Sequence, residues 1–162
     1  SFGKGQMLMR DYQKRSDICG VLLEMCEDVA KRARTAGYVG RTISLGLSYS
    51  QAAMTKGFYR SKTIEEPTND TMTLYTVCKE LLDTHFVGEP ARQLSVRLSN
   101  VEQAHSIQLD LFNTDKEKRQ TLAHTVDTIR DKFGATAVLR AASYTEAGTA
   151  VARNRLVGGH LA

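Results

Sequence analysis

Three stretches of the chain carry apolar residues at the spacing of an α-helix, one at about every third or fourth position. The first consists of Ile18, Leu22, Met25 and Val29, and the second of Leu74, Cys78, Leu81 and Leu82. The third consists of Leu122, Val126, Ile129 and Phe133. The turn-forming stretch 67–70 leads into the second, and Gly88 follows it. Each stretch therefore predicts a helix with one buried face.

Polar residues and glycines mark the ends of the first and third helices. Ser16 is expected to cap the start of the first, and Gly37 to end it. Thr114 and Glu117 have the spacing of a capping box, in which each side chain bonds the backbone at the other residue. Gly134 is expected to end the third helix.

Alternation of apolar and polar residues, which is typical of strands with one buried face, fills most of the gaps. It runs through residues 41–50 and 91–100, and residues 57–67 predict a further strand. Residues 5–10 and 137–144 predict two shorter ones. The inward positions of the two clearest strands are Ile43, Leu45, Leu47, Leu94, Val96 and Leu98.

The order strand, helix, strand, strand, helix, strand predicts an α+β fold with a four-stranded mixed sheet and two helices on one face. This is a ferredoxin-like or split βαβ arrangement. The third helix and the late strand would form a C-terminal extension. We expect a domain at 1–101, a loop at 102–115 and the extension with its tail at 116–162.

The sheet face away from the helices would be polar. It would carry Thr42, Ser44, Ser48, Gln93, Ser95, Arg97 and Ser99. Small hydroxyl residues with an occasional arginine let a phosphate backbone approach closely, although a merely solvated face has the same composition. The net charge is +4, and residues 1–62 hold 11 Lys and Arg against 5 Asp and Glu. This basic excess favours a polyanionic partner, again with a solvated surface as the alternative.

Motifs of catalysis and of metal binding are missing from the sequence. The 3 cysteines include no CxxC pair, and the 4 histidines stand apart from one another. There is no phosphate-binding glycine motif, no HExxH and no GxSxG. No apolar run approaches the length of a membrane span. We therefore expect a binding protein without catalytic residues, metal or cofactor, in the reducing cytoplasm.

Four stretches in order, "SFGKGQMLMRDY", "GRTISLGLSYS", "GFYRSKTIEEPTN" and "RQLSVRLSN", resemble the little finger of Y-family translesion DNA polymerases. The resemblance is to the ImpB/MucB/SamB, UmuC-like branch, and in particular to the UvrX-type proteins of Gram-positive bacteria. It extends through "AVLRAASYTEAGTA", which resembles the C-terminal extension of UmuC-like proteins.

The resemblance implies a DNA-binding domain of an error-prone DNA repair polymerase of the SOS response, which grips the primer–template duplex. Its partners would be that duplex, the sliding clamp and the catalytic core of its own chain, with no membrane. Catalytic carboxylates and Mg²⁺ belong to the palm of such polymerases, so this domain is expected not to be an enzyme itself. Family positions and the open face together give as DNA-binding candidates Lys4, Arg41, Thr42, Ser44, Arg60, Lys62, Thr63, Arg92, Gln93 and Arg97.

A short apolar motif follows the last strand of the predicted sheet. Gln108, Leu109, Asp110, Leu111 and Phe112 match the QLxLF peptide with which such proteins dock into the bacterial sliding clamp. The alternative is that these side chains pack under the third helix. For the whole chain, the alternatives are a free-standing ferredoxin-like regulatory or ligand-binding module and a small enzyme on the same fold.

Overall fold

The computed structural model describes residues 1–104, 114–157 and 160–161, and the chain divides into two compact units, Ser1–Ala104 and His105–Ala162. The elements of the first unit are β1 (Phe2–Tyr12), α1 (Arg15–Thr35), β2 (Tyr38–Tyr49), β3 (Phe58–Thr68), α2 (Thr71–His85) and β4 (Ala91–Gln103). This is the βαββαβ order that the alternation and the helical repeats predict, and the α+β class is confirmed.

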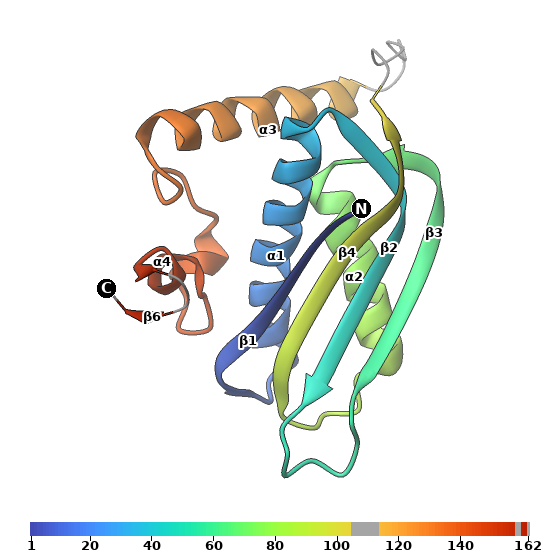
Figure 1. Ribbon diagram of the computed structural model, residues 1–162, viewed down its shortest axis with the longest axis vertical. Coiled ribbons are helices and arrows are strands. Elements are labelled where there is room, and N and C mark those ends of the chain that lie inside the picture. Colours follow the sequence, from blue (N-terminus) through green and yellow to red (C-terminus); the bar gives the residue numbers. More distant parts are fainter. Residues whose placement is uncertain (105–113, 158–159, 162) are drawn as a thin grey trace. The chain divides into compact units, whose positions relative to one another are not determined.

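The sheet of the first unit has the strand order β1-β4-β2-β3. Figure 1 shows the four strands side by side, and every neighbouring pair is antiparallel. The expectation of a mixed sheet is therefore wrong. Each helical crossover joins two parallel strands, but an antiparallel strand lies between them. β4 separates β1 from β2, and β2 separates β3 from β4.

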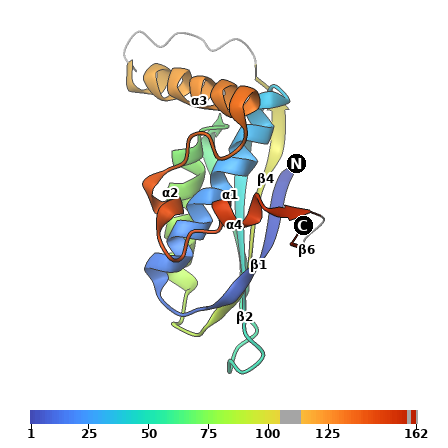
Figure 2. The ribbon, with the colours of Figure 1, turned by 90° about the vertical axis from the view of Figure 1, so that its left-hand side faces the viewer.

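Both helices of the first unit cover the same face of the sheet, as Figure 2 shows. The inward positions of β2 and β4 are buried as predicted, each at most 1% exposed: Ile43, Leu45, Leu47, Leu94, Val96 and Leu98. They meet the apolar faces of the helices, among them Ile18, Leu22, Met25, Val29, Leu74 and Leu82. The core thus lies between the sheet and the helices, and the other sheet face stays open.

The two helices begin differently. The side chain of Asp70 accepts a hydrogen bond from the backbone N–H of Thr73 and so caps α2. The expectation that Ser16 caps α1 is wrong, because the extended residue before the helix is Lys14. The Lys14 carbonyl accepts hydrogen bonds from the N–H groups of Asp17 and Ile18, so Ser16 already lies inside the first turn.

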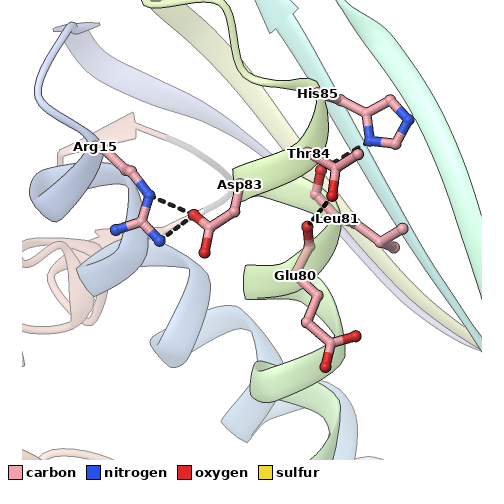
Figure 3. A network of polar contacts seen from close by, with 6 residues as sticks. All are labelled: Arg15, Glu80, Leu81, Asp83, Thr84 and His85. Atoms are coloured by element: carbon pink, nitrogen blue, oxygen red, sulfur yellow. Dashed lines mark hydrogen bonds and ion pairs between the residues drawn. The ribbon is translucent and has the colours of Figure 1, made fainter.

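Polar contacts along the two helices are drawn in Figure 3. The guanidinium of Arg15 on α1 pairs with the carboxylate of Asp83 on α2. Near the end of α2, the Thr84 hydroxyl and the His85 ring donate to backbone carbonyls one turn earlier, at 2.9 and 3.0 Å. Deeper between the helices, Cys26 and Cys78 are buried, free thiols.

The second unit contains α3 (Thr114–Phe133), the 3-10 helix η1 (Ala141–Tyr144), α4 (Ala150–Arg153), β5 (Leu156–Val157) and β6 (His160–Leu161). The strand predicted at 137–144 is wrong. There the Arg130 guanidinium donates to the Val138 carbonyl at 2.8 and 2.6 Å, and the N–H of Ser143 donates to the Arg140 carbonyl. These backbone groups therefore form hydrogen bonds to a side chain and within a tight turn, instead of the inter-strand hydrogen bonds that a strand would need.

The third helix has the predicted extent and ends before Gly134, whose φ is 106°. Its proposed apolar face is only partly covered, since Leu122 is 64% exposed and Phe133 69% exposed. The side chain of Thr114 lies outside the described part of the chain, so the capping box stays a prediction. No described helix is long and apolar enough to cross a membrane.

Candidate functional site

The open face of the sheet is built from rows of paired residues. In an antiparallel sheet, residues directly opposite each other point to the same face, and successive residues of a strand alternate. The strand register gives one row of Gly5, Ser95, Gly46 and Tyr59, and a second of Gly3, Arg97, Ser44 and Ser61. A third row consists of Ser99, Thr42 and Thr63. These three rows are therefore made of glycines and hydroxyl residues, with one arginine and one tyrosine.

Hydroxyl groups bridge β2 and β3 on this face. The hydroxyl oxygens of Thr42 and Thr63 lie 3.0 Å apart, and those of Ser44 and Ser61 lie 2.8 Å apart. Such cross-strand pairs hold two side chains flat against the sheet. A hydroxyl has one donor and two acceptor positions, so each pair keeps hydrogen-bonding capacity for a partner. Ser44 is only 3% exposed, so in its pair that capacity lies with the exposed Ser61.

Glycines let the larger side chains lie low over the sheet. A Cβ at Gly46 would overlap the Ser95 hydroxyl and come within 3.1 Å of the Tyr59 ring, so that ring lies against β2. A Cβ at Gly3 would meet the Arg97 side chain at 3.7 Å, so the arginine extends over β1. Both side chains cross the face and leave its floor shallow.

Three charged or amide side chains belong to the same face. Arg97 is exposed and has no acidic partner among the described residues. Arg92 and Gln93 lie at a register shift between the buried Ala91 and Leu94, which places both on the open side. There the Arg92 guanidinium lies 3.4 Å from the Asp11 carboxylate. Six of the sequence candidates thus share the open face: Thr42, Ser44, Thr63, Arg92, Gln93 and Arg97.

Four sequence candidates do not join them. Lys4 pairs with the inward Val96, and its ammonium binds Asp28 of α1 at 2.6 Å. Lys62 pairs with Ile43 and binds Glu80 of α2.

The other two are arginines. Arg60 pairs with Leu45, so it also points to the helix side. Arg41 lies one residue out of phase with Thr42, donates to the Glu65 carbonyl and faces Glu102 at 3.7 Å. A shift of one residue moves a strand side chain to the other face of the sheet. Resemblance to the family by position alone therefore could not separate the six candidates on the open face from these four.

The sequence candidates miss part of the site. Tyr59 and Ser61 lie on the open face beside residues that were identified, and so do the glycines of β1. Alternation within β3 could have found Tyr59 and Ser61, because Thr63 has the same phase. The motif from Gln108 to Phe112 lies outside the described residues. Among the described residues, no group of three or more His, Cys, Asp or Glu could hold a metal ion.

Donor groups therefore dominate a shallow, extended face: guanidinium, carboxamide and hydroxyl. Such a surface can hold the oxygens of an extended anionic chain that lies across the strands.

Comparison with known proteins gives three findings. Residues 1–111 match the model of the impB/mucB/samB family C-terminal domain. UvrX of Bacillus subtilis (strain 168), whose name refers to UV-damage repair, is 52% identical over 160 residues, which is 99% of this chain and 38% of UvrX. A protein named DNA polymerase IV 2 from Halalkalibacterium halodurans is 40% identical over 158 residues, which is 98% of this chain and 38% of that protein.

A solved structure has the same fold. It is titled as a complex of the beta-clamp processivity factor and the little finger domain of PolIV. It aligns with a TM-score of 0.51 at 12% identity, over 68% of this chain and 97% of that one. The chain thus spans less than half the length of these two relatives but nearly all of the solved domain.

Proposed function

The chain belongs to the impB/mucB/samB family, whose C-terminal domain occupies residues 1–111, and we propose that this domain grips the primer–template duplex for an error-prone DNA repair polymerase. The observation that carries the proposal is the open face, which brings Arg97 and Arg92 together with glycines and paired hydroxyls. Family membership favours this function over a free-standing regulatory module.

Contacts on this face suit the DNA backbone rather than the bases. Arginine, serine, threonine and glutamine donate to phosphate oxygens, and such contacts position a protein on DNA without reading its sequence. The shallow floor lets the backbone come close to the sheet. We therefore expect weak duplex binding with little preference for sequence.

The strand register gives this proposal a quantitative form. Each phosphate that a Lys or Arg neutralises releases counterions and contributes about −0.9 to the slope of log affinity against log salt. The basic sequence candidates Lys4, Arg41, Arg60, Lys62, Arg92 and Arg97 would together give a slope of about −5. If only Arg92 and Arg97 contact phosphates, the slope is about −2.

A salt titration of duplex binding by the full chain tests the proposal. Replacing Arg92 and Arg97 by Ala should remove most of the slope. The matched control replaces Lys4 and Lys62 by Ala, which removes the same charge from the helix side and should leave the slope unchanged. Their ion pairs are partly exposed, so the control should fold normally. Equal effects of the two double variants, or strong sequence preference, would contradict the proposal.

The same proposal includes docking to the sliding clamp through Gln108 to Phe112. It is supported by the match to the QLxLF peptide and by a domain of the same fold whose structure is titled as a clamp complex. Adjacent apolar anchors usually carry most of the affinity of such peptides. Replacing Leu111 and Phe112 by Ala should abolish clamp binding and spare duplex binding, measured on the same preparation. Clamp binding that survives would refute this part.

For the whole protein we propose template-directed DNA synthesis in the SOS response, in the cytoplasm. The names of relatives as DNA polymerase IV support it. Mg²⁺ and the catalytic carboxylates would then belong to the catalytic core, which is the further partner of this domain.

A further inference from the structure

We propose that Tyr59 is a positioning residue for the duplex, donating a hydrogen bond from its phenol to a phosphate oxygen on the same face as Arg97. The inference rests on the proposed function and adds a contact that the basic residues do not provide. It makes part of the grip independent of salt.

The position of Tyr59 is fixed by the register of three strands. Tyr59 of β3 is paired with Gly46 of β2, which is paired with Ser95 of β4. Both phase and pairing place its side chain on the open face, beside the Ser44–Ser61 hydroxyl pair. Because a Cβ at Gly46 would come within 3.1 Å of the Tyr59 ring, the ring rests on the glycine. The orientation of the phenol is therefore constrained rather than free.

The hydroxyl of Tyr59 is available for a ligand. The side chain is 54% exposed, and its hydroxyl has no hydrogen-bond partner among the described residues. Tyrosine combines an apolar ring that packs on the sheet with a polar end that can bond a partner. Tyr49, by contrast, is buried and its hydroxyl accepts a hydrogen bond from the N–H of Val87.

Spacing on the sheet fits two contacts along one DNA strand. Tyr59 and Arg97 are separated by two strand spacings and by one step of two residues along the strands. With strands about 4.8 Å apart and about 3.4 Å per residue, their Cα atoms are roughly 12 Å apart. Phosphates of one DNA strand follow the helical backbone and lie farther apart than the axial rise of about 3.4 Å per nucleotide, so this separation corresponds to about two nucleotides. The two side chains would contact different phosphates.

The experiment compares Tyr59→Phe with Arg97→Ala in the full chain, using one duplex over a range of salt concentrations. Tyr59→Phe keeps the ring over Gly46 and removes only the hydroxyl. It should weaken binding by about five- to tenfold at every salt concentration, because a neutral donor releases no counterion. Arg97→Ala should instead flatten the slope by about 0.9. Tyr75→Phe on α2, in the helix layer, is the matched control and should leave binding unchanged.

The outcomes separate the two proposals. If Arg97→Ala flattens the slope but Tyr59→Phe binds like the unchanged protein, the role of Tyr59 is refuted and the open face stands as the DNA site. If Tyr59→Phe changes the slope, a neutral hydrogen bond is also refuted. If neither Arg97→Ala nor the Arg92 and Arg97 double variant alters binding, the proposed function itself fails. Unchanged thermal unfolding of Tyr59→Phe excludes a folding defect as the cause of weaker binding.

Discussion

Replacing Asp70 by Ala should destabilise the first unit by about 1 to 2 kcal/mol. One oxygen of the Asp70 carboxylate accepts hydrogen bonds from the backbone N–H of Thr73 at 2.9 Å and from its hydroxyl at 2.8 Å. Loss of an N-cap side chain costs about 1 kcal/mol. The first turn of α2 contains no acidic residue, so Asp70 also supplies the negative charge at that helix terminus, which is worth about 0.3 to 1 kcal/mol.

Urea unfolding followed by circular dichroism, with hydrogen exchange of α2, measures the effect. For a domain of this size each kcal/mol lowers the Tm by roughly 4 to 8 °C. Asp70→Asn keeps an acceptor and removes the charge, so it should cost only the smaller, electrostatic part.

Ser16→Ala is the matched control, because Ser16 resembles a cap in sequence but lies inside α1. Its effect should stay within about 0.5 kcal/mol. The reasoning is refuted if Asp70→Ala falls in that range too, or if Ser16→Ala destabilises the protein more than Asp70→Ala does.

Two further predictions concern the helices of the first unit. Gly20→Ala, inside α1, should stabilise the protein by about 0.5 to 1 kcal/mol, because alanine favours a helix over glycine and the added Cβ meets no atom within 4 Å. Chemical denaturation measures this change, and a loss of stability would contradict the prediction. Interaction with Cys78 and burial raise the pKa of the Cys26 thiol. The contribution of this thiol to the free energy of unfolding should therefore be fully present below about pH 8.5, the pKa of an unfolded cysteine. It should be lost as the pH rises through the pKa of the folded state. Unfolding measured between about pH 8 and 10 should show this decline, and Cys26→Ala should reduce it even though the cavity lowers stability throughout.

Elements of the first unit could be predicted because each buries one face. The spacing of Ile18, Leu22 and Met25 and the alternation of Ile43, Leu45 and Leu47 both follow from contact with a single core. The region 137–144 has no such face. There the structure depends on the bonds from the Arg130 side chain to Val138, which no periodic pattern records.

Strand neighbours could not be predicted in the same way. Alternation assigns each residue to one of two faces within its own strand, but pairing decides how the faces of different strands match. Thr42 and Ser44 have clear apolar neighbours, so their face was predicted correctly. Lys4 and Lys62 lie on edge strands and were assigned by family position, and pairing with Val96 and Ile43 places them on the helix side.

The pairing of charges within the first unit also changes how its basic excess should be interpreted. Basic residues that face a carboxylate of the same unit include Lys4, Arg10, Arg15, Arg41, Lys62 and Arg92. The lysines at the two edges of the sheet bind α1 and α2, so their charge orients the helices and blunts exposed strand edges. On the open face, Arg97 can attract a polyanion, and Arg92 would be shared between Asp11 and a ligand. Because so few charges lie on the open face, duplex binding there must depend on neutral hydrogen-bond donors. It must also depend on close approach of the DNA backbone to the sheet at Gly46 and the hydroxyl pairs. Duplex affinity should therefore be modest and should fall with salt far less steeply than the net charge of residues 1–62 suggests.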